Sequence, residues 1–129
     1  MRLLVTGGAG FIGSHFVRTI LSGGYAGWAD ASVTVLDKLT YSGNRANLDP
    51  VADSPRLTFV EGDICDAATV EDVMAGHDMV VHFAAESHVD RSIAGPDDFI
   101  NTNCFGTNIV MDTARRLEIG RVEIGRAHV

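Results

Sequence analysis

A glycine-rich turn lies near the start of the chain, between a strand-like segment and a helix-like one. Residues Arg2–Thr6 form a short apolar run, and Gly7-Gly8-Ala9-Gly10-Phe11-Ile12-Gly13 follows it directly. The apolar residues of Phe11–Leu21 then recur at a spacing close to one helical face. Glycines at such a junction let backbone N–H groups approach a pyrophosphate at the positive end of the helix dipole. The pattern therefore predicts a phosphate cradle with Gly7, Gly10 and Gly13 as candidate residues. The alternative is a glycine turn that binds no ligand, while a Walker-type site is disfavoured because no Gly-Lys-Ser/Thr follows.

Strand-like and helix-like segments alternate along the rest of the chain. Further strands are expected at residues 33–37, 57–61 and 79–84, and helices at residues 67–75 and 97–117, with one helical turn at residues 44–48. Such alternation indicates βαβ units with right-handed crossovers and a parallel sheet. We therefore expect an α/β fold with a Rossmann-type doubly wound parallel sheet, truncated after about four strands. A fifth strand is reached only at Arg121-Val122, so the fourth strand is expected to be an unpaired edge.

An acidic residue ends the second expected strand. The carboxylate of Asp37 could accept hydrogen bonds from the adenosine ribose hydroxyls and would repel a 2′-phosphate, which favours NAD over NADP. Lys38 follows it and could weaken that discrimination. After the third strand, Asp63 and Ile64 could offer an acceptor and an apolar wall to an adenine. Ordinary turns at a strand end and at a helix entry are the alternatives for these positions.

Composition narrows the partners and the compartment. The formal net charge is −7 and no basic stripe is present, which argues against a general nucleic-acid-binding surface. No stretch approaches the roughly 20 apolar residues of a membrane span, and the first residues do not read as a signal peptide. Cys65 and Cys104 form no C-x-x-C pair and lie near no histidine cluster, so no metal site is predicted. We expect a cytoplasmic protein with reduced thiols.

Residues 123–129 read as non-native sequence. They can be back-translated so that, from the second base onward, they match a widely used short-read sequencing adapter. We therefore expect residues 1–122 to be the N-terminal part of an NAD(P)-binding domain and residues 123–129 to be adapter read-through. The alternative is a natural sequence that repeats the Glu-Ile-Gly-Arg of residues 118–121 by chance.

Three stretches resemble a known family. They are residues 6–15 with the glycines, residues 36–48, and residues 82–92, which read His-Phe-Ala-Ala-Glu-Ser-His-Val-Asp-Arg-Ser. Residues 1–122 resemble the extended short-chain dehydrogenase/reductases and, among these, the dTDP-glucose 4,6-dehydratases. The resemblance implies NAD as cofactor, the nucleotide sugar dTDP-glucose as substrate, and a homodimeric parent protein. It places at the cofactor Phe11, Ile12, Asp37, Lys38, Leu39, Thr40, Asp63, Ile64, Phe83, Ala84, Ala85, Glu86, Ser87 and Thr102. Ser87 is also placed at the sugar nucleotide.

The catalytic residues that the resemblance implies are not found in this chain. In the family NAD removes hydride from sugar C4 and returns it to C6 after water is lost, with a tyrosine and a lysine four residues later as the base. The tyrosines here are Tyr25 and Tyr41, and the residues four positions later are Ala29 and Arg45. The family's Asp-Glu pair would lie on the fifth strand. We therefore assign no catalytic residue and expect this chain to be inactive, although its parent is an enzyme. His82, on an apolar strand, is expected to be a core residue.

Two other functions stay open. A nucleotide-sugar epimerase or decarboxylase of the same superfamily would share the N-terminal motifs and differ on the next strand. A non-catalytic NAD-binding module would bind the cofactor without turning over a sugar.

Overall fold

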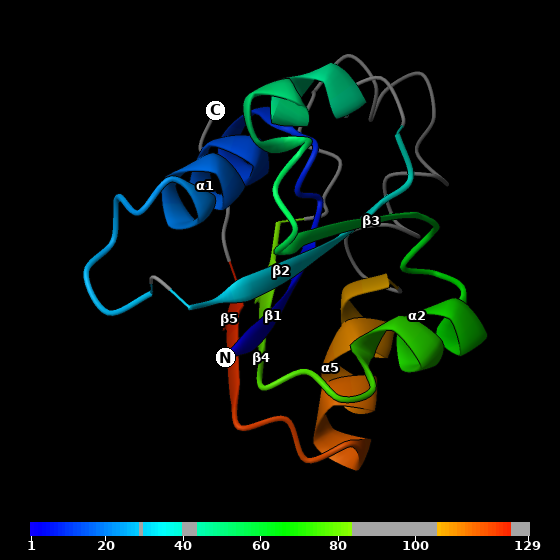
Figure 1. Cartoon of the computed structure of the whole chain (residues 1–129). Coiled ribbons are helices and arrows are strands. Elements are labelled where there is room, and N and C mark those ends of the chain that lie inside the picture. The colour runs from blue at the N-terminus through cyan, green and yellow to red at the C-terminus, as the bar shows by residue number, and fades with distance from the viewer. Residues whose placement is uncertain (29, 40–43, 84–105, 125–129) are drawn as a thin grey trace.

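A five-stranded parallel sheet forms the middle layer of the structure, a computed structural model (Figure 1). Residues 1–28, 30–39, 44–83 and 106–124 are described. The strands are β1 (Arg2–Thr6), β2 (Ser32–Asp37), β3 (Leu57–Glu61), β4 (Met79–His82) and β5 (Arg121–Ile124), in the order β3-β2-β1-β4-β5. Chain order reverses beside β1, because β2 lies on one side of it and β4 on the other. Open parallel sheets bind ligands at such a switch point, beyond the carboxyl ends of the strands.

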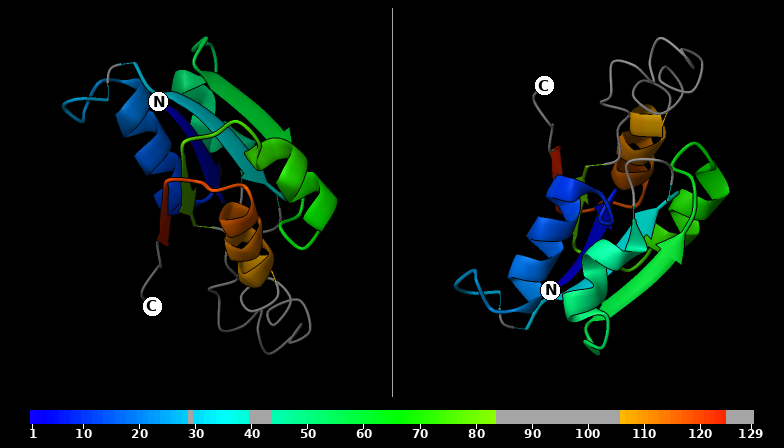
Figure 2. Two further views of the ribbon diagram at one scale, coloured as in Figure 1. Left: turned by 90° about the horizontal axis from the view of Figure 1, so that it is seen from below. Right: turned by 90° about the horizontal axis from the view of Figure 1, so that it is seen from above.

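Helices cover both faces of this sheet (Figure 2). α1 (Phe11–Leu21) and the 3-10 helix η1 (Arg45–Val51) lie on one face, and α2 (Ala67–Met74) and α5 (Thr107–Arg116) lie on the other. Each face has its own apolar cluster. The first joins Leu3 and Val5 to Val17 and Ile20 of α1, and the second joins Leu4 and Leu36 to α2 and α5. The expected doubly wound α/β fold is confirmed.

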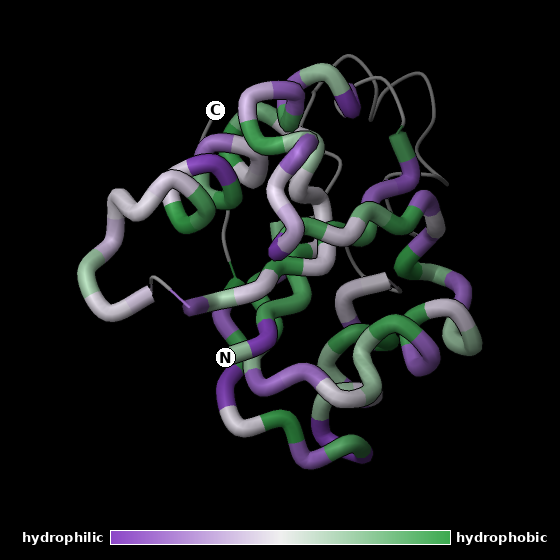
Figure 3. Tube along the Cα trace, in the orientation of Figure 1, coloured by the Kyte–Doolittle hydropathy of each residue, from purple (hydrophilic) through white to green (hydrophobic). Residues whose placement is uncertain are grey.

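The central strand β1 has apolar side chains on both of its faces. Leu3, Leu4 and Val5 are all 0% exposed, and hydrophobic residues follow the inner strands in Figure 3. A strand that helices cover on both sides needs such a continuous apolar run rather than an alternating one. The same reasoning accounts for β4, where every residue is buried.

Local signals set the ends of the helices. Asp66 precedes α2, and its side chain accepts a hydrogen bond from the backbone N–H of Thr69 at 3.3 Å, as an N-cap does. Gly76 lies just after α2 with φ of 81°, a conformation that favours glycine. Helix α1 starts after Gly10, which has extended backbone and offers no side-chain cap.

Two expectations about the fold need correction. The fourth strand is not an unpaired edge, because β4 pairs in parallel with β5, which runs from Arg121 to Ile124. The prediction left only Arg121-Val122 for a fifth strand, because residues 123–129 were expected to be adapter read-through. The helical turn expected at residues 44–48 is the longer helix η1, which continues through Pro50 to Val51. For the helix expected at residues 97–117, the described part is α5.

Candidate functional site

The glycine turn joins the carboxyl end of β1 to α1 and fits tightly against β2. Gly7 has a φ of 72°, and its N–H donates to the carbonyl of Leu36 at 2.8 Å. A Cβ on Gly8 would lie 2.7 Å from the Cγ1 of Val35, and one on Gly13 would lie 2.3 Å from the carbonyl oxygen of Gly7. Distances this short exclude a side chain, so the turn requires glycine here for close approach as well as for backbone conformation.

Within the described part of the chain, the first backbone N–H groups of α1 have no hydrogen-bond acceptor. The first intrahelical acceptor is the carbonyl of Gly10, which accepts from the N–H of Ser14 at 2.9 Å. The N–H groups of Phe11, Ile12 and Gly13 therefore have no intrahelical acceptor. No acidic side chain lies in the first turn of α1, and Gly10 supplies no cap. The side chains of Phe11 and Ile12 are 88% and 42% exposed. This end of the helix suits an anion, flanked by apolar surface.

The Asp37 carboxylate lies against this turn. Its Oδ2 accepts a hydrogen bond from the backbone N–H of Ala9 at 2.9 Å, and its Oδ1 accepts one from the N–H of Leu39 at 2.8 Å. Leu39 has a φ of 58°, the left-handed region that favours glycine, and the bond to Asp37 holds it there. The sequence predicted that Asp37 and the glycine turn serve one ligand, and in the structure the Asp37 carboxylate contacts Ala9 of that turn directly.

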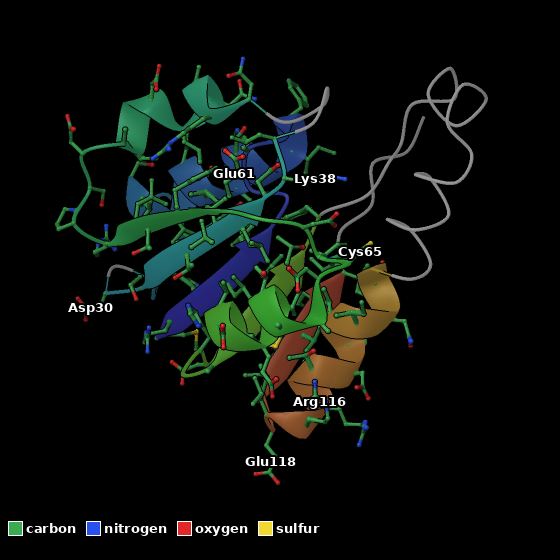
Figure 4. The ribbon with its side chains drawn as sticks, turned by 90° about the vertical axis from the view of Figure 1, so that its right-hand side faces the viewer. Asp30, Lys38, Glu61, Cys65, Arg116 and Glu118 are labelled. Carbon is green, nitrogen blue, oxygen red and sulfur yellow. The ribbon has the colours of Figure 1, made fainter. Side chains whose placement is uncertain are left out.

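Lys38 and Asp63 bridge the ends of β2 and β3. The Lys38 Nζ lies 3.2 Å from Asp63 Oδ2, and the N–H of Cys65 donates to Asp63 Oδ1 at 2.9 Å. Partial burial raises the pKa of Asp63, but the Cys65 N–H and the Lys38 ammonium outweigh this and lower it below its ordinary value. In Figure 4, Lys38 and Cys65 lie on one side of the molecule, away from Asp30, which precedes β2. Ile64 is 4% exposed and packs in the second apolar cluster.

The end of β4 carries a buried imidazole. The Nδ1 of His82 lies 2.6 Å from the hydroxyl of Thr6, and its Nε2 lies 2.9 Å from the hydroxyl of Thr107. Burial lowers the pKa of His82 from 6.5 to about 4, so the ring is neutral at pH 7. The expectation that His82 is a core residue is confirmed. Phe83 follows it and packs on Phe16, with ring centroids 5.6 Å apart.

Several candidate residues from the sequence lie outside the described residues. These are Thr40, Ala84, Ala85, Glu86, Ser87 and Thr102. The other candidates are described, and they follow the carboxyl ends of four neighbouring strands. The glycine turn and the start of α1 follow β1, Asp37 and Lys38 lie at the end of β2, Asp63 follows β3, and Phe83 follows β4. Among the described residues, no group of His, Cys, Asp or Glu could hold a metal ion. No described helix is long and apolar enough to cross a bilayer.

Sequence reasoning missed the residues that support the turn from behind. The side-chain amide of Asn47 donates to the carbonyl of Ala9 at 2.8 Å, and the backbone N–H of Asn44 donates to the same oxygen at 3.0 Å. The hydroxyl partners of His82, on Thr6 and Thr107, were missed as well. These contacts join segments distant in sequence, and no local pattern marks them. The one available signal was that residues 44–48 belong to a family motif.

Relatives of known function share most of this chain. The family model described as GDP-mannose 4,6 dehydratase matches residues 4–126. A dTDP-glucose 4,6-dehydratase of Streptomyces niveus is 59% identical over 121 residues, which is 94% of this chain and 36% of that protein. The low-salt glycan biosynthesis protein Agl12 of Haloferax volcanii is 52% identical over 121 residues, 94% of this chain and 37% of that protein.

Solved structures of a dehydratase and an epimerase also resemble this chain. The dTDP-glucose 4,6-dehydratase DesIV of Streptomyces venezuelae, with NAD and TYD bound, superposes with a TM-score of 0.90 at 59% identity, covering 95% of this chain and 38% of DesIV. A UDP-glucose 4-epimerase of Thermotoga maritima with UDP-glucose superposes with a TM-score of 0.80 at 32% identity, covering 96% of this chain and 37% of the epimerase. This chain therefore spans little more than a third of the length of these proteins.

The fold and the site together define a class. A parallel sheet whose strand order reverses beside β1, with a glycine turn at its carboxyl edge, is a Rossmann-type α/β unit. The chain belongs to the GDP-mannose 4,6 dehydratase family, as the match over residues 4–126 shows. The resemblance to dTDP-glucose 4,6-dehydratases seen in the sequence is confirmed.

Proposed function

We propose that this chain forms the NAD-binding part of a dTDP-glucose 4,6-dehydratase. The observation that carries the proposal is the 2.9 Å hydrogen bond from the Ala9 N–H to Asp37 Oδ2. This bond holds a carboxylate beside the glycine turn, which we propose to bind a phosphate group. Adenosine ribose and pyrophosphate are neighbours in a dinucleotide, so one ligand of this class can engage both features.

The described residues fit the cofactor at three points. The N–H groups at the start of α1 would receive the pyrophosphate, and the absence of side chains at Gly8 and Gly13 lets the turn pack closely against Val35 and the carbonyl of Gly7. Asp37 would accept hydrogen bonds from the adenosine ribose, and Asp63 would lie at the adenine. When bound, NAD supplies the hydride acceptor, and the residues of this chain bind and orient it.

The charges at this edge favour NAD over NADP. A 2′-phosphate would lie beside the negatively charged carboxylate of Asp37 and be repelled by it. Asp37 is buried, with 8% of its surface exposed. Lys38, the cation that could offset this repulsion, is 3.2 Å from Asp63 and is partly neutralised there. The proposed preference for NAD follows from these two contacts.

Cofactor titration by calorimetry tests the binding proposal. NAD should bind, and NADP should bind at least about tenfold more weakly. Asp37→Asn keeps the size of the side chain but removes its charge, so it should weaken NAD and narrow the difference between the two cofactors. Asp53→Asn, at an exposed aspartate after η1, is the matched control and should change neither affinity. If neither cofactor binds to the unaltered chain, the proposed function is wrong.

The activity of the whole protein is a separate part of the proposal. Relatives named dTDP-glucose 4,6-dehydratase support it, and neither tyrosine of this chain has a lysine four residues later. The chain alone, given NAD and dTDP-glucose, should form no 4-keto-6-deoxy sugar, and the full reading frame should form it. An epimerase is the second candidate, because UDP-glucose 4-epimerases share this fold at about 30% identity. Such an enzyme would instead return a sugar inverted at C4.

The remaining expectations stay part of this proposal. The resemblance supports a cytoplasmic, homodimeric parent protein, which light scattering after size exclusion and fractionation of the source cells would test. Residues 123–129 are proposed to be adapter read-through because of their match to the adapter sequence. Re-sequencing the locus decides this, and a genomic stop codon directly after Val129 would contradict it.

A further inference from the structure

A single residue at the centre of the glycine turn, Ala9, is held through the two peptide units that flank it. The N–H of Ala9 donates to Asp37 Oδ2 at 2.9 Å. Its carbonyl oxygen accepts two hydrogen bonds, from the Asn47 side-chain amide at 2.8 Å and from the Asn44 backbone N–H at 3.0 Å. Ala9 itself is 0% exposed. All three contacts come from segments at least 28 residues away in sequence. Asp37 accepts from the N–H of Ala9, and Asn44 and Asn47 both donate to its carbonyl oxygen.

Asn47 is well placed to fix this carbonyl because its own backbone is anchored. The guanidinium of Arg18, on α1, donates to the carbonyl of Asn47 at 2.6 Å. The next residue, Leu48, is 2% exposed and packs in the first apolar cluster. Helix η1 is therefore attached to α1 on one side and to the sheet on the other. The amide of Asn47 reaches the turn from a rigid support.

The direction of the Ala9 carbonyl decides what the turn presents to an anion. That carbonyl and the N–H of Gly10 belong to one peptide plane, so holding one fixes the other. In the observed orientation the carbonyl points toward η1, and the Gly10 N–H donates to Gly7 at 3.1 Å. A rotated plane would direct the negative end of the carbonyl dipole toward the phosphate and would misalign the N–H groups that follow.

We infer that Asn47 is a positioning residue for the pyrophosphate: its side-chain amide locks the Ala9 peptide so that the first N–H groups of α1 face the ligand. The inference rests on the proposed binding of NAD. Asn47 itself does not contact the cofactor but acts through Ala9. Removal of its amide should therefore weaken ligands that contain the pyrophosphate and leave adenosine binding through Asp37 and Asp63 unaffected.

The test compares three ligands on two substitutions of Asn47. Asn47→Ala removes the donor, and Asn47→Asp replaces it at nearly equal size with an acceptor that faces the carbonyl. NAD and ADP-ribose should each bind about tenfold more weakly to both variants, and adenosine, followed by NMR, less than about twofold. Asn108→Ala and Asn108→Asp, at an exposed asparagine of α5, are the matched controls and should bind all three ligands as the unaltered chain does. An equal loss for all three ligands, or no loss for NAD, overturns the inference.

A second measurement needs no ligand. Hydrogen exchange of the Gly10 amide should become at least about tenfold faster in Asn47→Ala, while the Val17 amide in the middle of α1 stays unchanged. Unchanged exchange at Gly10 overturns the inference even if the variants fold. If the unaltered chain binds no NAD, the proposed function fails, and the exchange result still decides whether Asn47 holds the turn.

Discussion

Lowering the pH from about 7.5 to about 5 should destabilise this fold through protonation of His82. His82 is buried, with 3% of its surface exposed. Burial lowers its pKa from 6.5 to about 4. The interval of about 2.5 pH units corresponds to about 3.5 kcal/mol at about 1.4 kcal/mol per unit. At about pH 5 the unfolded ring is almost fully protonated and the folded ring is mostly neutral, so about 2 kcal/mol of this is already lost.

The direction of the effect follows from the proton balance. A folded pKa below the unfolded one means that the unfolded chain binds more protons between pH 4 and 6.5. The stabilisation is complete above about 6.5 and is lost as the pH falls toward about 4. His77 shifts in the same direction because of burial and nearby Arg2. Asp63 and Asp112, whose pKa values lie below 3.8, lose their contribution only at lower pH.

Urea unfolding at both pH values measures this loss. His82→Gln keeps a donor and an acceptor for Thr6 and Thr107 but cannot titrate, so it should remove most of the pH dependence. His77→Gln is the control and should remove a smaller part. If His82→Gln does not fold, NMR titration of the unaltered chain decides the matter, since its His82 ring should stay neutral down to about pH 5. A titration midpoint above about 6 would refute the reasoning.

Three substitutions should change stability by predictable amounts, measured by urea unfolding at about pH 7.5. Gly13→Ala puts a Cβ 2.3 Å from a backbone oxygen and should cost about 3 kcal/mol, whereas Gly120→Ala, with its nearest atom at 3.7 Å, should cost less than about 0.5 kcal/mol. Equal costs would contradict the close packing of the turn. Asp66→Ala removes the N-cap of α2 and should cost about 1 kcal/mol; a neutral result would show that solvent replaces the cap. Arg56→Lys should cost about 1 kcal/mol, because one ammonium cannot reach both carbonyls that the guanidinium contacts at 3.0 and 2.9 Å. No change would mean that only one of those bonds matters.

Local signals were enough to predict much of the fold. The bounds of β1, α1 and β3 agree with the expected ranges because glycine punctuation and apolar spacing act within a few residues. Helix η1 was underestimated, because one turn was expected at residues 44–48 and the helix runs from Arg45 to Val51 with Pro50 inside it. The pairing of β4 was missed because residues 123–129 were expected to be non-native, and β5 extends into that segment as far as Ile124.

In the candidate site, too, local sequence features could be predicted and contacts between distant segments could not. The glycines and Asp37 were found because a turn and a strand end place them by sequence alone. The roles of Asn47 and Thr107 depend on which segments the fold brings together, and residues 38 and 25 positions apart carry no signal of that. Ile64 packs in the second apolar cluster, and its place beside the adenine stays a prediction.

The two hydrogen bonds of Asp37 have a thermodynamic consequence for ligand capture. Its carboxylate is already immobile before any cofactor arrives, because each oxygen is bonded to a backbone N–H. Ordering a free side chain on association typically costs about 0.5–1.5 kcal/mol in entropy. The Asp37 side chain is already ordered in the folded protein, so ligand binding does not include that cost. The hydrogen bonds between Asp37 and a ribose should therefore contribute to the binding free energy with almost no loss from ordering of this side chain.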